Sequence, residues 1–184
     1  WASQAEPPIA VLLMRALLRQ YRHEFGTAMA DLDAVVARDP GNTEAMQWQF
    51  ALHLVQADYA AARASCAKLA PSATQLAAAA CVAVIDSISG KSRAAYAAVS
   101  AALQRYPTRD LEYRQWLMTR QAEMALRFGD KALAERHFRE AIATGVVDGF
   151  VLAAYADFLI DEQRPAEVVP LLKGWVASDV LLLR

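Results

Sequence analysis

Apolar residues recur along the chain at helical spacing, and small side chains among them mark a longer period. Small residues stand at Ala28, Ala62, Ala95, Ala134 and Val168, with spacings of 34, 33, 39 and 34 residues. Four and seven positions after each, apolar residues follow, which describes one face of an α-helix. These are Leu32, Cys66, Val99, Phe138 and Leu172 at four, and Val35, Leu69, Ala102, Ala141 and Trp175 at seven. A period near 34 residues predicts a stack of helical hairpins.

A second set of residues places the other helix of each hairpin. Twelve positions before the small residues stand Ala16, Phe50, Ala83, Ala122 and Ala156, and the four alanines let two helices approach closely. The turns inside the hairpins are expected at His23-Glu24, Ala57-Asp58, Gly90-Lys91, Gly129-Asp130 and Gln163-Arg164. The wider spacing before Ala134 adds residues that lengthen a helix or form a loop. Leu111, Trp116 and Leu117 favour the longer helix because they are apolar and need burial.

Two stretches match a known repeat. The run from Ala122 to Asp130, continuing through Ala134 and Phe138, resembles the tetratricopeptide repeat family, as does the segment from Phe25 to Asn42. The resemblance implies an all-α, right-handed superhelical solenoid of antiparallel helix pairs with about five repeats. The expected organisation is a leader at 1–8, a single solenoid over 9–182 with repeats at about 9–42, 43–75, 76–114, 115–148 and 149–182, and a further or capping helix starting at 183–184. Arginine outnumbers lysine, which hints at a bacterial genome.

The charge and hydropathy of the chain limit the kinds of partner that we expect. The formal net charge is −1, whereas a nucleic-acid-binding protein usually carries a basic stripe, so no nucleic-acid partner is expected. The longest uncharged stretch, 69–85, is interrupted by Pro71 and is too short to cross a bilayer. The chain begins at Trp1 and ends in the apolar run 180–183, so we expect trimmed ends. A following helix or another subunit would cover that run, which allows a homo-oligomer through this end.

The two cysteines stand on neighbouring predicted helices at comparable heights. Cys66 lies late in the second helix of its hairpin, and Cys81 lies midway along the next helix, with the turn near 71–73. Their rotation about the helix axes is not fixed by sequence, so a disulfide and two buried thiols both remain open. A disulfide would indicate an oxidising compartment, periplasmic or extracellular, and free thiols would indicate the cytoplasm.

No pattern of catalytic or metal-binding residues stands out, so we expect no enzyme activity, metal or cofactor. His23, His53 and His137 lie in different repeats, and His137 is expected on the outer helix surface. Asp157, Asp161 and Glu162 indicate a solvated acidic face rather than acid catalysis or a metal site.

The remaining candidate site is a groove. In the family, the first helix of each hairpin lines the concave side, where partners usually lie. The binding residues this implies are Gln47, Trp116, Arg120, Glu123, Arg127, Phe150 and Asp157. Aromatic residues and arginine are common binding anchors, although Trp116 and Phe150 can equally pack against neighbouring helices. The expected function is a non-catalytic scaffold that binds a peptide or helix of a partner protein. The alternatives are an accessory domain of a larger enzyme or transcription regulator, and a self-associating module.

Overall fold

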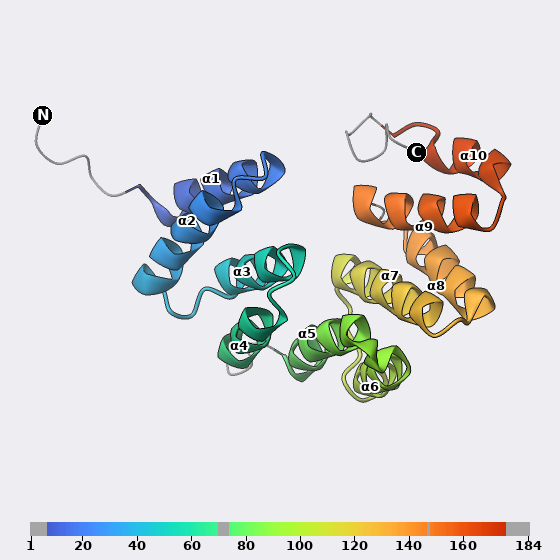
Figure 1. Ribbon diagram of the computed structural model, residues 1–184, viewed down its shortest axis with the longest axis horizontal. Coiled ribbons are helices and arrows are strands. Elements are labelled where there is room, and N and C mark those ends of the chain that lie inside the picture. Colours follow the sequence, from blue (N-terminus) through green and yellow to red (C-terminus); the bar gives the residue numbers. More distant parts are fainter. Residues whose placement is uncertain (1–6, 70–73, 147, 176–184) are drawn as a thin grey trace, which may run out of the picture. The chain divides into compact units, whose positions relative to one another are not determined.

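The computed structural model describes residues 7–69, 74–146 and 148–175, and within these ranges the regular elements are helices without a strand (Figure 1). The chain divides into two compact units, 1–85 and 86–184. The first unit holds α1 (Ile9–Tyr21), α2 (Phe25–Arg38), α3 (Thr43–Val55), α4 (Tyr59–Leu69) and nearly all of α5 (Gln75–Asp86). The second holds η1 (Ser87–Lys91), α6 (Ser92–Arg105), α7 (Leu111–Arg127), α8 (Lys131–Ala143), α9 (Gly149–Asp161), η2 (Pro165–Glu167) and α10 (Val168–Leu172). The all-α prediction is confirmed.

Four helix ends share one hydrogen-bonded turn. The backbone φ is positive at His23, Ala57, Gly129 and Gln163. In each case the next residue donates its amide to the carbonyl five positions earlier, over 2.8–3.0 Å, as in Glu24 to Arg19 and Asp130 to Ala125. This arrangement is the Schellman motif, which satisfies carbonyls that a helix end would leave unpaired. Gly90 also has a positive φ, so all five expected turns are confirmed.

Short polar side chains set where the helices begin. Asp130 accepts from the amide of Leu133 at 3.0 Å, so α8 starts directly after its turn. Asp110 accepts from the amide of Tyr113 at 3.0 Å, which starts α7 at Leu111. With 17 residues, α7 is longer than the 13-residue α8, as the wider repeat spacing predicted.

The repeating small residues form the core. Ala28, Ala62, Ala95, Ala134 and Val168 are all buried, and so are the five residues twelve positions before them. The sequence pattern also placed Trp175 on the apolar face of the last helix, and this prediction is wrong. Trp175 is exposed because the short α10 ends at Leu172, before the helical register reaches it. Thr119, one position before Arg120, is completely buried. Its hydroxyl donates to the Gln115 carbonyl at 3.0 Å.

Ion pairs connect neighbouring elements within each unit. In the first, the buried carboxylate of Asp31 on α2 accepts from both Arg15 and Arg19 on α1. These guanidinium groups lower the pKa of Asp31, mainly through the hydrogen bond from Arg15. In the second unit, Arg164 donates to both carboxylate oxygens of Glu135 at 2.9 Å. The hydrogen bonds from Arg164 and then Arg139 lower the pKa of Glu135 to about 2.

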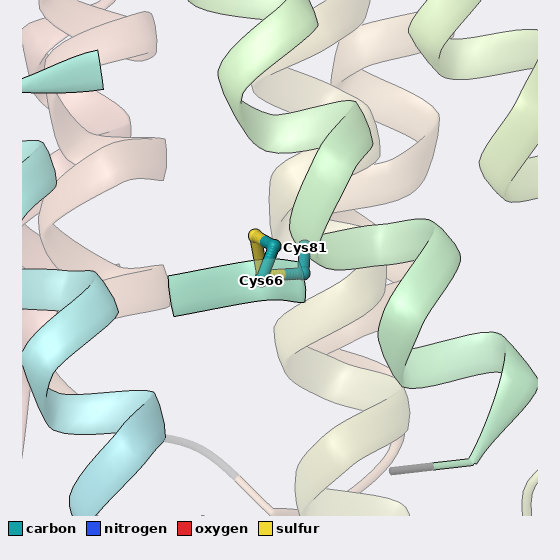
Figure 2. The surroundings of a disulfide bond; sticks show 2 residues. All are labelled: Cys66 and Cys81. Carbon is teal, nitrogen blue, oxygen red and sulfur yellow. A yellow bond between two sulfur atoms is a disulfide. The ribbon is translucent and has the colours of Figure 1, made fainter. Parts of the chain in front are cut away.

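The two cysteines lie together in the first unit. The sulfur atoms of Cys66 on α4 and Cys81 on α5 are 1.97 Å apart, and the Cα atoms are 5.8 Å apart (Figure 2). Of the two alternatives left open by the sequence, the structure therefore contains the disulfide. The bond closes a loop with a sequence separation of 15.

Two expectations of the sequence analysis lie outside the described residues. They are the turn near 71–73 and the apolar run 180–183. Among the helices of the described ranges, none is both long enough and apolar enough to cross a membrane.

Candidate binding surface

One face of α7 carries the polar and aromatic residues expected in the groove. Trp116, Arg120, Glu123 and Arg127 follow one another at intervals of four, three and four positions, which aligns them along the helix. The opposite face is buried through Leu117, Met124 and their neighbours. Because the apolar face fixes the rotation of α7, this polar row is left partly or fully exposed.

Arg120 lies between two aromatic rings from different helices. Its guanidinium carbon is 5.5 Å from the ring centroid of Trp116 on α7 and 4.4 Å from that of Phe150 in the first turn of α9. Both distances allow attraction between the cation and the negative ring faces. Arg120 also pairs with Glu123, with 2.9 Å between Nη1 and Oε2. The side chain is therefore held in one orientation while a quarter of it stays accessible.

Tyr113 extends this cluster and was missed by the sequence interpretation. Its ring stacks on Trp116, with centroids 5.6 Å apart and an angle of 15° between the ring planes. The hydroxyl is buried without a hydrogen-bond partner among the described residues, and burial raises the pKa of Tyr113 to about 12. Position 113 precedes Trp116 by three, so its place on the same helix face could have been found from spacing. We call Tyr113, Trp116, Arg120, Glu123 and Phe150 the arginine–aromatic cluster.

The other expected binding residues have different surroundings. Arg127 continues the exposed row of α7 and donates from Nη1 to the buried hydroxyl of Ser87 at 3.1 Å. Asp157 is exposed on α9, two helical turns after Phe150. Gln47 is exposed on α3, which belongs to the first unit. The structure thus brings together Trp116, Arg120, Glu123 and Phe150.

Solved structures with the same arrangement of helices decide the fold. A tetratricopeptide repeat protein from Parabacteroides merdae matches with a TM-score of 0.74 at 16% identity, over 96% of this chain and 69% of the other. TTC0263, a thermophilic TPR protein of Thermus thermophilus, matches with a TM-score of 0.75 at 15% identity, over 96% of both chains. PilF of Pseudomonas aeruginosa gives 0.64 at 16% identity, over 95% of this chain and 80% of the other.

The chain has the tetratricopeptide repeat fold. Neither a protein-family model nor a curated protein sequence matches it. The helix pairs of the structure are consistent with about five tetratricopeptide repeats.

A hollow on another part of the second unit is lined by residues of α6, α7 and α8. Its volume is about 400 Å³, and Tyr96, Met118 and His137 are among its lining residues. His137 was expected on the outer surface, but its side chain is largely buried. The Tyr96 hydroxyl lies 2.9 Å from Nε2, and a Glu140 carboxylate oxygen lies 3.3 Å from Nδ1. Burial lowers the pKa of His137, and Glu140 opposes part of that effect.

The side chains of these surfaces are suited to noncovalent contacts. Within the described part of the chain, no group of three or more His, Cys, Asp or Glu side chains is placed to hold a metal ion. The arginine–aromatic cluster offers two ring faces and a fixed guanidinium group. Aromatic rings and guanidinium groups are common anchors of protein–protein interfaces.

Proposed function

We propose that this protein is a non-catalytic scaffold whose tetratricopeptide repeats bind a peptide or helix of a partner protein through the first helices of the hairpins. The shared fold supports a protein-interaction scaffold at the level of the fold family. The observation that supports the position of the site is the arginine–aromatic cluster, because Arg120 is fixed between Trp116 and Phe150 and remains partly accessible.

The cluster has the features of a binding anchor. Tyr113 stacks under Trp116, and Phe150 packs on Arg120, so a ligand meets side chains that are already ordered. Preordered side chains lose little conformational entropy on binding, which favours affinity. Arg120 is paired with a single carboxylate, and Arg127 adds a second guanidinium group two helical turns along the same face. We therefore expect the partner segment to combine an apolar or aromatic side chain with a hydrogen-bond acceptor.

The test is site-specific photocrosslinking in cells of the source organism. A benzoylphenylalanine probe replaces Glu123 in the cluster, and a matched probe replaces Arg136, which is exposed on the second helix α8. We expect a discrete crosslinked protein from position 123 and none from position 136. That product should disappear when Trp116→Ala and Arg120→Ala are added, with helical circular dichroism unchanged. Equal crosslinking from both positions, or a product that survives both substitutions, would contradict the proposed site.

A further inference from the structure

The outer face of α1 is an exposed apolar stripe. Val11, Met14, Leu18 and Tyr21 follow at intervals of three, four and three positions, and are exposed by 49%, 57%, 56% and 73%. They lie on the side of α1 opposite to Leu12 and Ala16, which are buried against the first unit. Exposed apolar residues gathered along one helix face usually mark an interaction site.

The same positions are buried in three other first helices. We take Ala16 as the reference residue of α1, and the equivalent Phe50, Ala122 and Ala156 as those of α3, α7 and α9. Val11 stands five positions before the reference residue, and Leu18 stands two positions after it. In α3, α7 and α9, the residues at these positions are all buried. They are Ala45 and Leu52, Leu117 and Met124, and Val151 and Phe158. In each case the second helix of the preceding hairpin packs against that first helix: α2 on α3, α6 on α7 and α8 on α9. The outer face of α1 therefore has the residue pattern of one side of a helix–helix interface.

A polar contact recurs in the same three interfaces. The residue one position before the reference residue is Gln49, Gln121 or Tyr155, and each is buried. Gln49 donates to Asp33 on α2 at 2.7 Å, Gln121 donates to Ser100 on α6 at 2.9 Å, and Tyr155 accepts from Arg139 on α8 at 3.3 Å. The three partners all stand five positions after the small residue of their own helix. The covering helix thus supplies a matched polar side chain at one fixed position.

In α1, the residue one position before Ala16 is Arg15. The charges around Arg15 indicate which charge a covering helix should carry. Arg15 and Arg19 share the single carboxylate of Asp31, which leaves an excess positive charge next to the stripe. A carboxylate on the covering helix would complement that charge. In a second copy of this chain, the residue five positions after Val168 is the exposed Lys173, which lies just beyond the end of α10, so that copy offers a positive charge there instead of a carboxylate.

We infer that the outer face of α1 binds an amphipathic helix of another protein, in the geometry by which α2 covers α3. The apolar face of that helix covers Val11, Met14 and Leu18, and an Asp or Glu faces Arg15. The surface differs from the arginine–aromatic cluster, so this inference does not depend on the proposed function.

A peptide derived from α2 provides the probe. It has the sequence of residues 24–39 with Ala28, Leu32 and Val35 replaced by Gln, so that it cannot take the place of α2 on the inner face of α1. It keeps Asp33, the side chain that faces Gln49 in the α2–α3 interface. Titrated into the ¹⁵N-labelled chain, it should shift the amide resonances of α1 and saturate.

Three substitutions test the interface. Leu18→Glu should weaken peptide binding at least about tenfold, because it places a charge within the apolar contact. The matched control is Val55→Glu, since Val55 on α3 is 60% exposed and should leave binding unchanged. A peptide carrying Asp33→Lys should bind several-fold more weakly at low salt.

The inference is wrong if no α1 resonance shifts, or if Leu18→Glu leaves binding intact. It is also wrong if the chain without peptide dimerises in a way that Leu18→Glu abolishes, since the occupant is then a second copy.

Discussion

The guanidinium carbon of Arg120 lies 4.4 Å from the centroid of the Phe150 ring, so a side chain of α7 contacts the first turn of α9. The contact joins the first helices of two successive hairpins within the second unit. A second link between them is the hydrogen bond from Gln115 to Asp148, the residue that caps α9, at 3.2 Å. The candidate binding surface therefore also contributes to the stability of this unit.

Phe150→Ala should lower the free energy of unfolding by about 1–2 kcal/mol, because it removes a half-buried ring and its cation–π contact. Phe150→Leu should cost less, since it keeps the apolar contact. Urea denaturation measures both. Val169→Ala, at an exposed position on α10, serves as the control and should change stability little. A neutral Phe150→Ala would show that the ring does not pack on Arg120 in solution.

Reduction of the disulfide should destabilise the protein. A bridge closing a loop of this length stabilises by about 3 kcal/mol in the chain-entropy estimate, because it restricts the unfolded chain. Denaturation with and without dithiothreitol should therefore give different midpoints, and the Cys66→Ser, Cys81→Ser double variant should match the reduced protein. Thiol titration in denaturant without reductant should find neither cysteine free. Two free thiols in the protein as purified would disprove the bridge.

At the left-handed turn positions, replacing glycine should lower stability and introducing glycine should raise it. Gly129 has a φ of 86°, a conformation that costs other residues energy, so Gly129→Ala should destabilise by about 1 kcal/mol. Ala57 and Gln163 hold φ values of 57° and 59°, so Ala57→Gly and Gln163→Gly should each stabilise by a few tenths of a kcal/mol to about 1 kcal/mol. Thermal unfolding of the three single variants measures the effect. Loss of stability in both glycine variants would rule out the left-handed turns.

His137 should make stability depend on pH. Its pKa is lowered in the folded protein by burial, so below about pH 6.5 the unfolded chain binds more protons than the folded chain. The free energy of unfolding should therefore fall as the pH drops from 6.5 toward 5. His137→Gln, which retains a partner for Tyr96, should flatten that part of the profile. His23→Gln, at an exposed turn, should leave it unchanged, and identical profiles for wild type and His137→Gln would contradict the burial of His137.

Spacing alone predicted the hairpins, because a stack of helices repeats the same steric demand in every unit. Ala28 and Ala134 are fully buried, and the turns fall where the apolar stripe changes helix. Along α7, the same periodicity placed Trp116, Arg120 and Glu123 on one face. The position of Phe150 beside them depends on how α9 packs on α7, which only the structure shows.

The polar contacts were harder to predict because they depend on side-chain rotation and on the partner helix. His137 belongs to a charged stretch of sequence, yet it turns toward Tyr96 on a helix 41 residues away in sequence. Burial of Thr119 is tolerated because its hydroxyl donates to a backbone acceptor within its own helix. Tyr113 shows the opposite case, since its stacking on Trp116 follows from local spacing and could have been derived.

The bond between Cys66 and Cys81 has a consequence for how the chain responds to proteolysis. Cleavage at any peptide bond between these two residues leaves both fragments covalently joined. A nicked sample would migrate as one species on a non-reducing gel and separate into two after reduction.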